Sequence, residues 1–219
     1  MSEKVSLKTQ NMPFIILFLA WSISLYLLFF IGFNDFWGDL LSIFSKVNAE
    51  KGFLAVMAPL LAFTLSNVID ANKKAVLVFW KIKSPLPGCR AFTDIGPKDP
   101  RVDMNLLKDK LNVVPIEPAE QNRIWYRLYK EEEGKPAIDS SHKSFLLARD
   151  LTSISFLFLI LTPWTIINIT GNLRMTLIYA AICSLQYLIL CKVAQNTGER
   201  FVGNVLAEYC CKAPFKDFS

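Results

Sequence analysis

Residues Ser141–Trp164 read SHKSFLLARDLTSISFLFLILTPW, and this stretch decides the fold class. It opens with the only histidine of the chain, continues with basic residues and an aspartate, and then becomes apolar. Basic side chains at headgroup level followed by an apolar run are typical of a helix that enters a bilayer. We predict one continuous helix, capped by Asp139 or Ser140 and ending at Pro163, with Trp164 at the far interface. Its depth would be set by His142, Lys143 and Arg149.

Four apolar blocks are present, and 53% of the 219 residues are hydrophobic. A helix crosses the hydrocarbon core of a bilayer with about 20 residues. We therefore predict an all-α membrane protein with four transmembrane helices, at 13–33, 53–69, 151–169 and 173–191. Basic residues precede the first block, as in a signal peptide. Its length and the lack of a small-residue cleavage site predict a retained anchor rather than a cleaved signal.

The spans divide the chain into four parts. Residues 1–71 hold the N-terminal tail and the first two spans, and 72–150 form a small, mostly helical insert. Residues 151–192 hold the last two spans, and 193–219 form a C-terminal tail. Lys and Arg are concentrated in the two tails and the insert. The positive-inside rule then places both termini and the insert in the cytoplasm.

Between the first two spans, apolar residues recur at spacings of three and four over about 35–48. This pattern predicts an amphipathic helix that is too short to span and lies in the outer interface. It is interpreted as an interfacial anchor, and the alternative is a pore-lining or sensing element.

The insert contains one strongly marked helix, PAEQNRIWYRLYKEEEGK. Pro118 suits its first turn, and Gly134 ends it. At 100° per residue one apolar face is made by Ile124, Trp125, Leu128 and Tyr129. The opposite face carries a basic stripe, Arg123, Arg127 and Lys130.

The basic stripe has three interpretations: contact with anionic lipid, contact with an acidic partner or nucleic acid, or simple solvation. Residues 72–150 contain fifteen basic and eleven acidic residues, a balance that argues against dedicated nucleic-acid binding. A soluble cytoplasmic protein is therefore the partner we expect for this helix, beside the lipid bilayer and further copies of the chain.

Motifs of enzyme chemistry are missing from the sequence. It has no Gly-rich phosphate loop, no G-x-S-x-G and no H-E-x-x-H. With one histidine and no Cys-x-x-Cys a zinc site is not expected, and no cofactor is predicted. The pair Cys210–Cys211 is interpreted as two free thiols, with acylation as the alternative. The enzyme alternative is a lipid-modifying protein that uses His142 and Asp150.

Arginine and aromatic side chains together suit an anionic ligand, because a guanidinium forks onto phosphate and a ring stacks on a base. Membrane anchoring explains the region around the histidine as well, and both interpretations stay open. The candidate contacts to a partner or anionic ligand are Arg123, Trp125, Arg127, Lys130, His142 and Arg149.

The layout of four spans with one cytoplasmic insert between the second and third resembles the small membrane components of bacterial anti-phage systems. Examples are the four-helix membrane protein of the Kiwa system and the four-helix effectors of cyclic-nucleotide defence. The resemblance covers the layout of the whole chain and rests on no motif. It implies a homo-oligomer in the inner membrane that scaffolds a soluble effector or disrupts the membrane.

The resulting expectation is a non-enzymatic, oligomeric sensor or scaffold that recruits a soluble cytoplasmic partner. The first alternative is an oligomeric pore gated by a ligand at the insert. In an oligomer, polar residues of the spans would meet between helices, and in a pore they would line the channel. The candidates are Ser66, Asn67, Ser153 and Ser155.

Overall fold

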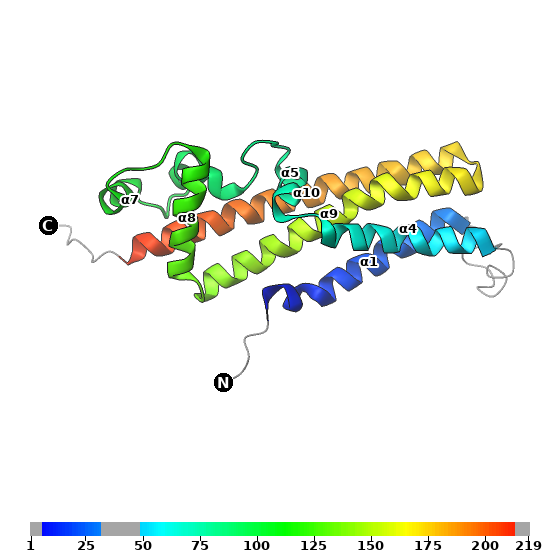
Figure 1. Cartoon of the computed structure of the whole chain (residues 1–219), viewed down its shortest axis with the longest axis horizontal. Helices are drawn as coiled ribbons and strands as arrows, with labels where there is room; N and C mark the ends of the chain where they lie inside the picture. The colour runs from blue at the N-terminus through cyan, green and yellow to red at the C-terminus, as the bar shows by residue number, and fades with distance from the viewer. Residues whose placement is uncertain (1–5, 32–48, 213–219) are drawn as a thin grey trace, which may run out of the picture.

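The computed structural model describes residues 6–31 and 49–212, and within these ranges it contains eight α-helices and no strand (Figure 1). The first helices are α1 (Leu7–Ile31), α4 (Ala49–Val68) and α5 (Ala71–Phe79). A 3-10 turn, η1 (Pro87–Arg90), a π-helical turn, η2 (Ala91–Ile95), and the short α6 (Gly96–Lys98) follow. The remaining helices are α7 (Met104–Leu111), α8 (Pro118–Glu132), α9 (Pro136–Thr170) and α10 (Leu173–Cys211). The predicted interfacial helix at 35–48 lies outside the described residues.

The hairpin of α9 and α10 runs the full length of the molecule (Figure 1). The helices have 35 and 39 residues, so at 1.5 Å per residue they are about 52 and 58 Å long. A bilayer core is only about 30 Å thick. The hairpin therefore has room to cross a membrane and to continue for about 20 Å beyond it.

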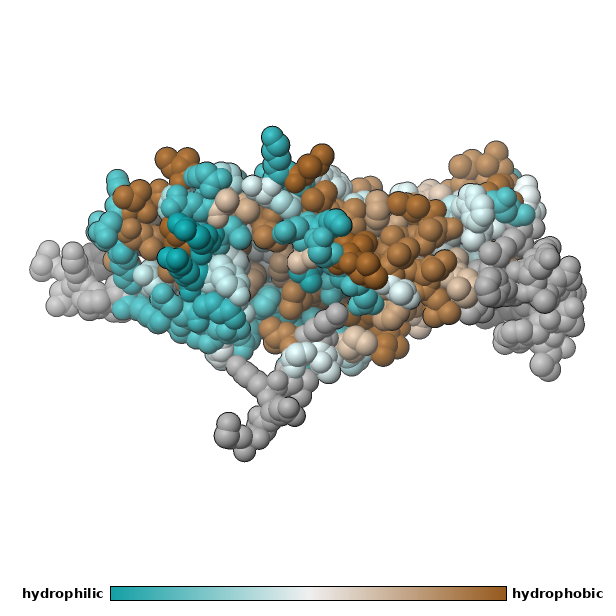
Figure 2. All heavy atoms as spheres, viewed as in Figure 1, coloured by the Kyte–Doolittle hydropathy of each residue, from teal (hydrophilic) through white to brown (hydrophobic). Residues whose placement is uncertain are grey.

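Other helices pack on the two ends of this hairpin, and they define two regions. The shaft comprises 7–31, 49–68 and 151–191, where α1 and α4 lie along α9. The head comprises 71–150 and 192–211, where α7 and α8 lie at the end of the hairpin at which α10 finishes, and α5 lies beside the middle of the hairpin, at the border with the shaft (Figure 1). Figure 2 shows hydrophobic side chains over the shaft and mostly hydrophilic ones over the head.

Three helices are long and apolar enough to cross a membrane, which confirms a large part of the predicted fold class. Their apolar stretches lie within Thr9–Phe30, Pro136–Asn168 and Leu173–Cys211. The fourth predicted span falls in α4, where the apolar stretch found in the described residues is Met57–Val68. This stretch is shorter than a span, so the fourth crossing stays a prediction.

The helix through Ser141–Trp164 is continuous as predicted, but both of its predicted ends are wrong. It begins at Pro136 with Lys135 as the N-cap residue, and Pro163 lies inside it. Proline is tolerated in membrane helices because neighbouring groups satisfy the backbone that it frees. The helix ends instead at Gly171, whose φ of 63° is the left-handed conformation that favours glycine.

Helix α8 forms as its sequence predicts. Pro118 occupies the first turn, and the Glu117 carboxylate accepts a hydrogen bond from the Glu120 amide at 2.7 Å. Gly134 has a φ of 97°, which ends the helix. The predicted apolar face turns inward, with Trp125 and its neighbours on that face packed in the head core.

The segment from residue 193, predicted as a tail, continues α10 as helix to Cys211. A Cβ atom at Gly198 would lie only 2.9 Å from the Phe145 ring, so the glycine allows α10 to pack closely on α9. The head core is then built from α5, η2, α8, α9 and α10. Its largest buried members include Phe79, Phe92, Trp125, Tyr129, Phe145 and Phe201.

Candidate functional site

A cavity of about 420 Å³ lies in the head between η1, α8, α9 and α10. We call it the aromatic cavity, because six of its lining side chains carry rings. The ring-bearing residues are Trp125, Tyr126, Tyr129, His142, Phe145 and Phe201. Its polar lining residues are Asn122, Lys130, Glu133 and Arg149. Pro87 and Gly88 close one side, and a Cβ at Gly88 would meet the Asn122 side chain at 2.4 Å.

Phe201 of α10 holds the rings of the aromatic cavity in place. The His142 ring stacks on it, with centroids 4.6 Å apart and planes at 2°. The Trp125 and Tyr129 rings meet it edge-on, at 5.2 and 5.4 Å. Tilted and edge-to-face ring pairs add about 0.5–1.5 kcal/mol beyond burial alone. The ring arrangement is therefore rigid, and it joins α8 and α9 to α10.

A short hydrogen-bonded chain fixes the tautomer of the histidine. The Tyr129 hydroxyl donates to Glu133 Oε1 at 2.9 Å and lies 3.2 Å from His142 Nδ1. Burial and the Glu133 carboxylate raise the pKa of Tyr129, so the hydroxyl stays protonated. Because its single proton goes to Glu133, His142 Nδ1 must carry a proton and donate to the tyrosine oxygen.

Behind the aromatic cavity, three charged side chains meet away from solvent. Lys74 Nζ lies 2.9 Å and Arg149 Nη2 3.2 Å from the same Asp150 oxygen. The Lys74 and Asp150 side chains are only 8% and 11% exposed. Two cations share one carboxylate, which leaves an excess positive charge in a desolvated place. This cluster also ties α5 to α9 where the head meets the shaft.

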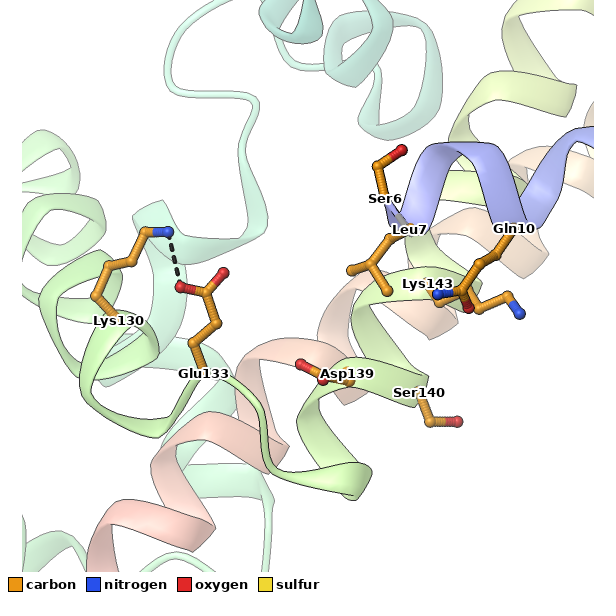
Figure 3. Close-up of a pocket in the computed structure, with 8 residues that line it drawn as sticks. All are labelled: Ser6, Leu7, Gln10, Lys130, Glu133, Asp139, Ser140 and Lys143. Carbon is orange, nitrogen blue, oxygen red and sulfur yellow. Dashed lines mark hydrogen bonds and ion pairs between the residues drawn. The ribbon is translucent and has the colours of Figure 1, made fainter. Parts of the chain in front are cut away.

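A second, larger cavity of about 790 Å³ lies beside the first, and we call it the polar cavity (Figure 3). Ser6, just before α1, and Leu7 and Gln10 of α1 face α8 and α9 across it. Asp139, Ser140 and Lys143 line the α9 side. Lys130 and Glu133 line both cavities and pair with each other at 2.9 Å. Nearby, Asn11 Nδ2 donates to the Lys143 carbonyl at 2.9 Å, which joins the start of α1 to the head.

The structure brings together some of the predicted contact residues and separates others. Trp125, Lys130, His142 and Arg149 all line the aromatic cavity. Arg123 and Arg127 are exposed, and Arg123 pairs with Glu120 at 3.3 Å. Trp125 is only 7% exposed, so it is placed to contact a small ligand in the cavity rather than the surface of a partner.

The four polar residues of the spans lie apart from this site. Ser66 and Asn67 both donate to the Phe63 carbonyl within α4, at 2.7 and 3.0 Å. Ser153 is buried and donates to the Arg149 carbonyl at 2.9 Å. Ser155 is also buried and accepts a hydrogen bond from Gln186 of α10 at 3.4 Å. Three of the four are thus buried inside one chain, and Asn67 is exposed.

Sequence reasoning missed Phe201, Lys74 and Gly88. A signal for Phe201 is present, because Ala194, Gly198, Phe201 and Val205 recur at helical spacing and predict that α10 continues. No local pattern marks Lys74, which meets Asp150 from 76 residues away. Of the two C-terminal cysteines, Cys210 is buried and Cys211 is exposed, so only Cys211 presents its thiol at the surface.

Comparisons with protein-family models, with curated proteins and with solved structures found no match for this chain. The function is therefore argued from the geometry of the head and the shaft.

Proposed function

We propose that this chain is a non-enzymatic, homo-oligomeric membrane protein that acts as a sensor or scaffold and recruits a soluble cytoplasmic protein. The shaft anchors it in the bacterial inner membrane with four crossings, and the head and both termini lie in the cytoplasm. We place the protein in anti-phage defence because its layout, four spans with one cytoplasmic insert, resembles the small membrane components of such systems.

The observation that carries this proposal is the unbroken continuation of α9 and α10 from the shaft into the head. Both helices contain a membrane-length apolar stretch, and both also contribute to the head core. A partner bound to the head is thus held by two helices that continue into the membrane. Such an arrangement suits a scaffold, and it lets a change in the head move the shaft.

The surface available to a partner is the outward face of α8 and the loop before it. Arg123 and Arg127 are exposed there. Ile116, which precedes the helix, is 81% exposed. Exposed arginines and an exposed apolar side chain are typical of protein interfaces, where arginine is enriched and binding energy concentrates in few residues.

The test is the mass of the complex extracted gently in detergent from cells that carry the native gene neighbourhood. We expect a homo-oligomer that holds a second, soluble protein at fixed stoichiometry. Arg127→Glu should release that protein, whereas Lys108→Glu, an exposed charge reversal on α7, should retain it. A homo-oligomer without a partner that leaks ions would overturn the scaffold and favour the ligand-gated pore.

A further inference from the structure

The aromatic cavity has the size and lining of a ligand site. Its volume of about 420 Å³ falls in the range of roughly 300–1,000 Å³ that is usual for small-molecule pockets. Flat rings from three helices form its apolar part, and Lys130 and Arg149 add positive charge. A planar group can lie against the rings while an anionic group reaches the cations.

Two lining residues of this cavity, Trp125 and Arg149, have a polar group that is incompletely satisfied. The indole Nε1 of Trp125 is buried and has no hydrogen-bond partner among the described residues. A buried donor without an acceptor is destabilising. Arg149 shares Asp150 with Lys74, so the carboxylate neutralises only one of the two cations. An anion in the cavity would neutralise the other.

The remaining charges at the cavity do not oppose an anion. Glu133 is the one acidic residue in the lining, and Lys130 Nζ lies 2.9 Å from its Oε2. The Tyr129 hydroxyl donates to its Oε1. The glutamate is thus already paired, and the lining together with the Lys74–Asp150–Arg149 cluster keeps one positive charge in excess.

From these observations we propose that the aromatic cavity binds a nucleoside monophosphate or a closely similar planar anion, with its base against the aromatic rings and its phosphate on Arg149. This proposal gives the proposed sensor a ligand class. Binding of the ligand needs no partner protein. Only the effect that binding would have on the sensor or scaffold rests on the proposed function.

The site is placed so that a ligand acts on the head–shaft junction. A phosphate on Arg149 competes with Asp150 for the guanidinium, and Asp150 is the residue that holds Lys74 of α5 against α9. Binding would therefore change the contact between α5 and α9 at the point where α9 leaves the head. A ligand can shift the equilibrium between two arrangements of α5 on α9 only if it binds one of them more tightly than the other.

The experiment is calorimetric titration of the full chain in phosphatidylcholine nanodiscs with AMP, GMP, CMP and UMP. Adenosine, inorganic phosphate and glycerol phosphate are titrated in parallel. We expect saturable binding of at least one nucleotide, at least about tenfold tighter than that of nucleoside or phosphate alone, because both groups contribute. Arg149→Gln should weaken it about tenfold or more, the usual effect of losing a charge-assisted hydrogen bond.

Two further variants separate a binding defect from a folding defect. Tyr126→Ala removes a half-exposed ring at the cavity and should weaken nucleotide binding while the thermal midpoint stays near that of the wild type. Arg123→Gln, on the same helix but outside the lining, should bind as the wild type does.

The proposal is overturned if no nucleotide binds up to about 1 mM, or if inorganic phosphate binds as tightly as a nucleotide. It is also overturned if glycerol phosphate binds as tightly and nanodiscs with phosphatidylglycerol abolish nucleotide binding, which would make the cavity a lipid-headgroup site. If the soluble partner is still retained in any of these cases, the proposed scaffold function holds although the ligand proposal fails. Failure of the ligand site and failure of the scaffold function are therefore distinguishable.

Discussion

In the head, Phe201 of α10 contacts rings from both α8 and α9. In the shaft, a single ring pair, Phe156 and Tyr187, joins the described residues of α9 and α10, and hydrogen bonds join them as well, among them the hydroxyl pair of Tyr179 and Thr162. Among the residues whose side chains are described, the head has one large buried core and the shaft has two small ones. Leucine and isoleucine side chains on the outer side of α10 stay exposed in the shaft. The exposed surface of the same two helices is thus apolar in the shaft and mostly polar in the head, which is what the proposed membrane anchor requires, with lipid around the shaft and water around the head.

The difference follows from what drives packing in each solvent. In water, removing apolar surface stabilises the head by roughly 25 cal/mol per Å². In lipid the hydrocarbon tails are as apolar as leucine, so helices associate by close packing and by interhelical hydrogen bonds. The comparison predicts that truncating a large apolar side chain is costly in the head and nearly neutral on the outside of the shaft.

The largest effect is expected for Phe201→Ala. The ring is buried and holds three others, so its loss should cost about 3–5 kcal/mol of unfolding free energy. Leu185→Ala, at a shaft position that is 60% exposed, should cost less than about 0.5 kcal/mol. Thermal unfolding of the full chain in detergent micelles measures both. Equal losses would refute the division into two regions.

The next effect concerns the buried charge cluster, which belongs to the junction of the two regions. Asp150→Asn leaves Lys74 and Arg149 side by side without a counter-charge, and we expect a loss of about 3 kcal/mol. Lys74→Met leaves the Arg149–Asp150 pair intact and should cost only about 1 kcal/mol. The same unfolding assay gives both values. A larger loss for the lysine variant would show that Arg149 does not neutralise Asp150.

A pH dependence should also be confined to the head. Burial opposes ionisation of Glu132, but the ammonium groups of Lys135 and Lys212 outweigh it and lower the pKa of Glu132 below its usual value. Ionised Glu132 therefore stabilises the folded state. Its contribution is complete above pH 4.5, the pKa of this group in the unfolded state, and it is lost as the pH falls through the lower pKa of the folded state.

Thermal midpoints measured by circular dichroism between pH 7 and about pH 3 test this expectation. The head transition should fall with pH in the wild type and fall less in Glu132→Gln. The shaft segments 7–31 and 151–191 contain no Asp or Glu, and 49–68 contains only Glu50 at the start of α4, so a shaft transition should move less than the head transition. Identical pH curves for the wild type and the variant would remove Glu132 from the explanation.

The parts of the fold that the sequence predicts well are those that depend on local pattern. Helix α8 is marked by Pro118 and Gly134, and α9 by its change from charged to apolar residues. Its true end was missed, because Pro163 reads as a stop in water but is tolerated where neighbouring helices surround it.

The candidate site could be predicted only in part, because its residues come from distant segments. His142 and Arg149 are seven residues apart on one helix, a spacing that places them on the same face. The ring that stacks on His142 belongs to Phe201, and the lysine that meets Asp150 comes from a different helix. Tertiary packing alone creates these contacts, and a single sequence carries no record of them.

The smallest effect should come from the hydrogen bond that distinguishes the shaft. Thr162 Oγ1 donates to the Phe158 carbonyl at 2.6 Å, so the Tyr179 hydroxyl must donate to Thr162, at 2.7 Å. A double-mutant cycle of Tyr179→Phe and Thr162→Val in micelles isolates this bond, and we expect a coupling of about 0.6 kcal/mol, the usual size within membranes. The corresponding head cycle, Phe201→Ala with Trp125→Ala, should couple more strongly, because edge-to-face rings add about 0.5–1.5 kcal/mol. A shaft coupling above that of the head would mean that the hydroxyl pair, rather than close packing, dominates association of α9 with α10.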